Sequence, residues 1–172
     1  MSDLPATYAP PEDPAGRLLW RLSRVSAVAG GYLLAASALL TTLSITLNAL
    51  FKAPIHGEYE IVSFGTSLAV YLFLPWCQMV RGNIVVDFFL SGASGRLREA
   101  LDAVGATLYC AICILLTWRL AVGGLELLGQ EQATAVLKIP YWWSFPIILY
   151  SLSLLVVVTL HGIAANIRKV MA

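Results

Sequence analysis

Two closely spaced cysteines are the first residues in this chain whose types could do chemistry. Cys110 and Cys113 form a C-x-x-C pattern, which in redox proteins requires an accessible thiolate stabilised by a helix N-terminus or a nearby cation. Both lie inside an apolar run, where a thiolate is costly, and Cys77 lies in another such run. We therefore expect the cysteines to serve as small packing residues, with no secreted disulfide framework.

The two histidines could in principle ligate a haem group. His56 lies in a polar stretch before Glu58, whereas His161 lies toward the end of the last apolar run. These positions are predicted to be near opposite faces of a membrane, so one haem cannot join them. We expect no catalytic residue, no metal site and no cofactor in this chain.

Solute transport by the chain alone would require a coupling site, usually an acidic residue within a span or an unwound helix. The first, second and fourth apolar runs contain no Asp, Glu, Lys or Arg, and no Gly/Pro cluster interrupts the middle of a run. Pro75 and Pro146 lie near run ends and are read as packing kinks. The sequence thus predicts a chain that does not move a solute by itself.

Composition indicates an all-α integral membrane protein. Of 172 residues, 59% are hydrophobic and 12% are charged, about half the charged share of soluble domains. Net charge of +1 gives no sign of nucleic-acid binding. Residues 1–17 are expected to form a flexible cytoplasmic tail and 18–172 one membrane domain, with four transmembrane helices near 25–50, 61–80, 102–127 and 140–166.

The basic residues predict the orientation of these spans. Arginines and lysines concentrate before the first span, after the second and at the C-terminus, which places both termini in the cytoplasm. On the opposite, outer side we expect an aromatic belt, and on the inner side a tryptophan anchor; the candidate interfacial anchors here are Trp20, Tyr141, Trp142 and Trp143.

The connector from Arg81 to about residue 100 holds Asp87 among large apolar side chains. We expect a short interfacial amphipathic segment between the second and third spans, with Phe88 and Phe89 inserted into the membrane surface. The alternative is an ordinary cytoplasmic loop whose apolar residues pack against the helices.

Six charged residues near the ends of the spans are candidate partner-interface or structural polar sites: Glu58, Glu60, Arg81, Asp87, Arg119 and Glu126. Arg119 lies in the outer part of the third span, with Glu126 two turns further along the same face. One hypothesis pairs Arg119 with Glu58 or Glu60 at the start of the second span. The alternative is that Arg119 reaches the outer lipid headgroups.

Several short motifs follow one another over about residues 44–146. The first are an asparagine (Asn48), a basic-aromatic patch (Phe51-Lys52) and a turn (Pro54-Ile55). A glutamate then opens the second span, within Gly57-Glu58-Tyr59-Glu60. A Gly-led connector ends in Asp (Gly82-Asn83-Ile84-Val85-Val86-Asp87), and an Ile-Pro is followed by aromatics (Leu137-Lys138-Ile139-Pro140-Tyr141-Trp142-Trp143). In this order the chain resembles the small membrane subunit of TRAP (tripartite ATP-independent periplasmic) transporters. It departs from that family at Asn83, where His is common, and at Lys52, where an Arg-Tyr pair is frequent.

The resemblance implies a non-catalytic small permease subunit in the bacterial inner membrane. Its partners would be a large multi-span subunit, which carries the substrate pathway and the sodium sites, and a periplasmic substrate-binding protein that captures an organic acid. The small subunit would brace the large one and help dock the binding protein. Two rival classes remain open on the residues alone, a four-helix membrane anchor of a redox complex and a small homo-oligomeric exporter.

Overall fold

The protein consists of long helices packed against one another. The computed structural model describes residues 13–80, 95–129 and 132–171, with side chains at 13–80, 104–129 and 132–164. The elements are α1 (Pro14–Phe51), α2 (Glu58–Met79), α4 (Gly95–Leu128), a short 3-10 turn η2 (Tyr141–Ser144) and α5 (Phe145–Met171). Four helices in the described part are long and apolar enough to cross a membrane. This confirms the predicted all-α membrane architecture.

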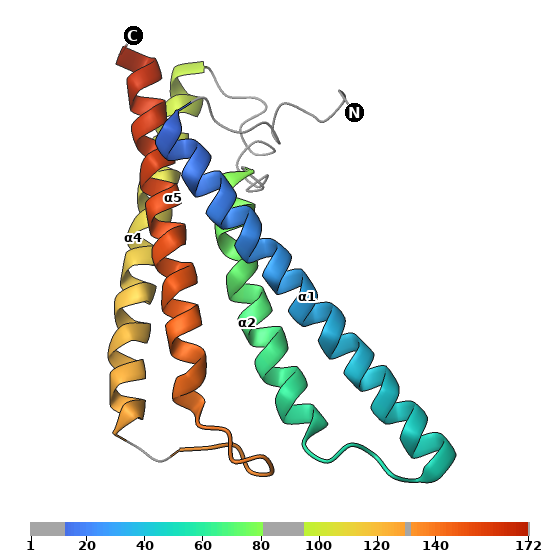
Figure 1. Cartoon of the computed structure of the whole chain (residues 1–172). Coiled ribbons are helices and arrows are strands. Elements are labelled where there is room, and N and C mark those ends of the chain that lie inside the picture. The colour runs from blue at the N-terminus through green and yellow to red at the C-terminus, as the bar shows by residue number, and fades with distance from the viewer. Residues whose placement is uncertain (1–12, 81–94, 130–131, 172) are drawn as a thin grey trace, which may run out of the picture.

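The helices pack in an order that differs from their order in the chain. α1 packs on α2, α2 on α5, and α5 on α4. Figure 1 shows α4 and α5 side by side, with α1 running obliquely so that its later half diverges from α4 and α5. The start of α1 and the end of α5 lie at the same end of the molecule, as an even number of crossings requires.

A row of small residues allows α1 to approach α2 closely. Its members recur every seven positions along α1 and are all buried: Gly16, Ser23, Gly30, Ser37 and Ser44. A Cβ added at Gly30 would lie 3.2 Å from the carbonyl oxygen of Ala69, and one at Gly65 of α2 would lie 2.6 Å from Ser37 Oγ. Small side chains at such spacing bring helix backbones together where the lipid offers no hydrophobic drive.

α5 is the most buried helix, because it lies between α2 and α4. Its residues Ile148, Leu152 and Leu155 form the core cluster together with Cys113 of α4. On the α4 side, a Cβ at Gly124 would lie 2.5 Å from the Phe145 ring, so glycine is what permits this approach. α5 is therefore the central helix, packed between α2 and α4.

The first residues of α1 and α5 differ from the ends of the predicted spans. α1 begins at Pro14, so residues 14–17, which were expected to belong to the flexible tail, are helical; residues 1–12 lie outside the described part. Proline at the first helical position supplies the required φ and lacks only an N–H that would be unpaired. At the other end of the chain α5 begins at Phe145, after η2, and not at Pro140.

Candidate functional site

The first turn of α2 and the loop before η2 form the best-defined polar site in the described structure. Glu60 accepts two hydrogen bonds through its two carboxylate oxygens: the Val136 N–H donates to Oε1 and the Leu137 N–H donates to Oε2, both at 2.8 Å. Hydrogen bonds to an ionised carboxylate are about twice as strong as neutral ones. A single side chain of α2 thus holds the tip of a loop that lies 76 residues later in the chain.

The loop is also closed by hydrogen bonds of its own. Thr134 N–H donates to the Ile139 carbonyl at 3.0 Å, and Ile139 N–H donates to Thr134 Oγ1 at 2.9 Å. Lys138 takes the left-handed conformation with φ 53°, which turns the chain back, and Ala133 pairs with Pro140 as an isolated antiparallel bridge. The two N–H groups that Glu60 binds therefore belong to a turn that has internal hydrogen bonds of its own.

Packing fixes the loop to α2 at two further points. Gly57 has φ +80°, and a Cβ there would lie 2.6 Å from Leu137 Cγ, so glycine is required both by the backbone and by the space. Phe64 of α2 stacks on Tyr141, with ring centroids 5.7 Å apart. We call the assembly of Gly57, Glu60, Phe64 and the loop 132–141 the α2 clamp.

Apolar side chains are exposed around the α2 clamp. Tyr59 is 85% exposed, Trp143 60% and Val136 59%. Trp142 and Trp143 contact each other edge to face, with centroids 6.2 Å apart. Tyr141, Trp142 and Trp143, the anchors predicted from the sequence, thus gather at this end of the bundle, where their rings can meet a membrane interface or a partner protein.

Arg119 does not form the predicted ion pair. The Glu60 carboxylate is taken by the loop amides, and neither Glu58 nor Glu126 forms an ion pair or hydrogen bond with Arg119 in the described part of the chain. Arg119 is exposed on α4. The predicted pairing is thus not seen among the described residues. For Glu60 the reason is that backbone N–H groups, which a sequence pattern does not reveal, bind the same carboxylate.

The predicted residues at the other end of the molecule are only partly described. Trp20 packs edge to face on Trp76 of α2 with centroids 5.6 Å apart, and the Arg24 guanidinium lies 5.2 Å from the centre of the Trp20 ring. Trp20 thus joins α1 to α2 as well as standing near the predicted interface. The predictions for Arg81, Asp87, Phe88 and Phe89, with the interfacial segment they define, lie outside the described residues.

A polar contact that the sequence analysis missed joins α2 to α5. Pro75 has no N–H, so within α2 the carbonyl of Tyr71 loses its helical partner. The Ser151 hydroxyl of α5 donates a hydrogen bond to that carbonyl oxygen, and Ser151 is fully buried. The position of Pro75 in the sequence predicts that the Tyr71 carbonyl lacks a helical partner, but the sequence does not reveal that Ser151 faces this carbonyl.

The remaining candidates for chemistry are dispersed. Cys110 and Cys113 are 5% and 3% exposed and carry free thiols. His56 precedes α2 and His161 lies past the middle of α5. Among the described residues, no three His, Cys, Asp or Glu side chains lie close enough together to hold a metal ion.

The fold and the site define a multi-span membrane subunit with an ordered loop at one end. A model of the family described as "Tripartite ATP-independent periplasmic transporters, DctQ component" matches residues 37–169. The chain belongs to this family and is a small permease subunit of a TRAP transporter. No curated protein and no solved structure matches the chain.

Proposed function

We propose that this subunit braces the large membrane subunit of a sodium-coupled TRAP transporter for organic acids. It further helps to dock the periplasmic binding protein at the end of the bundle that carries the α2 clamp. The positive-inside pattern predicts that this end faces the periplasm and that both chain termini face the cytoplasm. Family membership supports this role over the redox-anchor and exporter alternatives.

The observation that carries the bracing role is how little of each span is buried within the subunit. Between 11 and 39% of the most apolar window of each span is buried. The helices pack mainly as α1 on α2, α2 on α5 and α5 on α4, so each span keeps apolar surface along its length. Surface of this kind can support a neighbouring membrane domain.

The α2 clamp supports the docking role. A partner that docks on a loop must order it first, and that ordering reduces the affinity. Here the Glu60 hydrogen bonds and the Phe64–Tyr141 stack hold the loop in one shape in advance. The exposed Tyr59, Val136 and Trp143 next to it supply apolar and aromatic area of the kind enriched at protein interfaces.

Reconstitution tests the proposal. Sodium-driven uptake of radiolabelled organic acids would be measured in proteoliposomes that hold the large subunit and the binding protein, with and without this chain. We expect uptake only when all three proteins are present. Equal uptake by the large subunit and binding protein alone would overturn the bracing role.

Docking is tested separately with the complete membrane complex. Replacing Tyr59 and Val136 by Ser is expected to weaken binding of the periplasmic protein without changing the ratio of the two membrane subunits. The paired change Leu39→Ser and Leu43→Ser, at exposed positions within α1, controls for general loss of apolar surface. Unchanged binding by the Tyr59/Val136 variant would contradict the docking role.

A further inference from the structure

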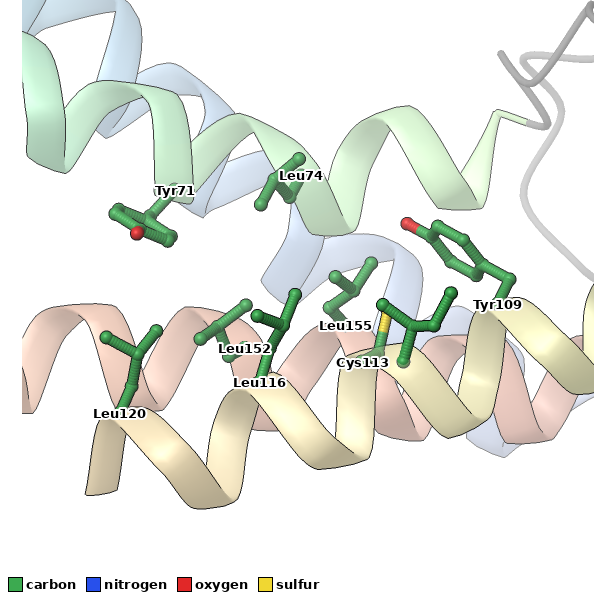
Figure 2. Close-up of a pocket in the computed structure, with 9 residues that line it drawn as sticks. Tyr71, Leu74, Tyr109, Cys113, Leu116, Leu120, Leu152 and Leu155 are labelled. Carbon is green, nitrogen blue, oxygen red and sulfur yellow. The ribbon is translucent and has the colours of Figure 1, made fainter. Parts of the chain in front are cut away.

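An apolar groove runs along α5 between α2 and α4. Its volume is about 230 Å³, and Figure 2 shows side chains of α2 facing those of α4 across it. The lining residues come from α2 (Tyr71, Leu74), α4 (Tyr109, Ile112, Cys113, Leu116, Leu120) and α5 (Leu152, Leu155). None of these side chains carries a charge, so the groove surface is as apolar as the interior of a membrane requires.

The groove follows from how α5 is held. Ser151 fixes α5 to the α2 backbone, and Gly124 lets α4 approach the start of α5. α2 and α4 each pack on α5 but make at most marginal contact with one another in the described part. The floor at Leu152 and Leu155 is 2% exposed, whereas the wall residues Ile112 and Leu116 are 48% and 46% exposed. The wall on the α4 side therefore has apolar surface that the described residues leave uncovered.

Arg119 lies on α4 one helical turn from Leu116, which lines the groove. It follows Leu116 by three positions, and residues three apart on a helix share a face. Gly123 is four positions further on, and a Cβ there would have nothing within 4 Å, so the backbone of α4 is open to close approach at this level. Arg119 makes no ion pair or hydrogen bond with the side chains that the structure describes.

The depth of Arg119 favours a protein partner over a lipid headgroup. It lies nine residues before Leu128, the last residue of α4, which is roughly 13 Å along the helix axis. A charge at such depth in a span is costly unless it is paired. A carboxylate on a neighbouring helix can lie level with the Arg119 guanidinium, whereas lipid phosphates are reached only if the side chain extends toward the membrane surface.

We propose that the groove seats one membrane-spanning helix of the large subunit. Apolar side chains of that helix fill the space between α2 and α4, and a carboxylate on it pairs with Arg119. The open backbone at Gly123 lets the two helices approach closely beside this ion pair. The inference rests on the proposed bracing function and assigns it a face: α2 and α4 on either side of α5.

A matched pair of tryptophan substitutions tests the groove. Leu116→Trp places a large ring in the groove, whereas Ile114→Trp places it on an exposed part of α4 outside the lining. Each variant would be co-expressed with the large subunit and purified through this chain in mild detergent. Overpacking an interface changes affinity by on the order of tenfold or more, so we expect at least about a tenfold lower yield of large subunit with Leu116→Trp. Ile114→Trp is expected to match the wild type.

Two further variants test the charge and guard against misfolding. Arg119→Leu is expected to reduce recovery of the large subunit, and Arg119→Lys to retain most of it, while circular dichroism and gel filtration of each isolated variant match the wild type. Recovery that is unchanged by Leu116→Trp, or reduced equally by Ile114→Trp, would overturn the proposal. A phospholipid that co-purifies with the wild type and is lost from Leu116→Trp, with unchanged recovery of the large subunit, would assign the groove to lipid instead.

Failure of the groove and failure of the bracing function give different results. If the wild-type chain recovers the large subunit and the groove variants do so equally, bracing stands and its proposed face is wrong. If the wild-type chain recovers no large subunit, both proposals fail together.

Discussion

The hydrogen bond from Ser151 to the Tyr71 carbonyl predicts an energetic coupling between Ser151 and Pro75. Pro75 leaves that carbonyl without its helical N–H partner, and no water is available in the membrane interior to replace it. Ser151→Ala removes the remaining donor. We expect the free energy of unfolding to fall by between about 0.6 and 2 kcal/mol, the range for hydrogen bonds between membrane helices and for buried groups left unpaired.

A double-mutant cycle isolates this effect from the loss of packing. In the Pro75→Ala background, the new N–H of residue 75 can bond to the Tyr71 carbonyl, so Ser151→Ala should cost less there. The expected coupling is on the order of 0.5–1.5 kcal/mol. Ser153→Ala is the matched control, because Ser153 is exposed and its hydroxyl donates only to the Tyr150 carbonyl of its own helix; its effect is expected within about 0.5 kcal/mol.

Equilibrium unfolding of the isolated subunit in mixed micelles, followed by circular dichroism, measures all four members of the cycle. The reasoning would be refuted if Ser151→Ala and Ser153→Ala had the same effect. It would equally be refuted if the cost of Ser151→Ala were the same with Pro75 and with alanine at that position.

Two further predictions concern the clamp and the approach of α4 to α5. Glu60→Gln keeps the size of the side chain but removes its charge, which weakens its hydrogen bonds to the loop. Amide hydrogens of the loop 132–140 are therefore expected to exchange with deuterium severalfold faster. Glu58→Gln, at a residue that does not hydrogen-bond the loop, serves as control, and equal exchange in the two variants would contradict the clamp. Gly124→Val places side-chain atoms against the Phe145 ring and is expected to destabilise the isolated subunit by about 1–3 kcal/mol. Gly123→Val, in open space, is expected to change stability by less than about 0.5 kcal/mol. Similar losses from both variants would show that crowding against Phe145 is not responsible.

The spans could be predicted from the sequence because each depends on local composition. A run such as Ile61–Val80 has only one low-energy environment, the membrane interior, whatever its neighbours are. Helix ends were predicted less well, since the helical backbone continues into polar residues as far as the turns allow. Thus α1 begins at Pro14 and α4 at Gly95, outside the apolar runs.

The pairing of polar groups could not be predicted in the same way. Glu60 was recognised as a candidate site, but its partners are the N–H groups of Val136 and Leu137, and every non-proline residue has such a group. Only the fold of the loop selects those two. The packing glycines were similarly ambiguous: Gly30, Gly65 and Gly124 meet neighbours inside the subunit, whereas Gly31 and Gly123 face open space.

The seven-residue spacing of small residues on α1 has a consequence for register. If α1 slid along α2 by one repeat, small side chains would again face α2, but Ser23 would take the place of Gly30. The Cβ of that serine would lie 3.2 Å from the Ala69 carbonyl oxygen, so the helices would have to move apart. Gly30 therefore disfavours the slipped alignment. Two contacts at the ends of the helix pair add to this choice: Trp20 meets Trp76, and the Ile55 N–H donates to Ser44 Oγ at 3.2 Å.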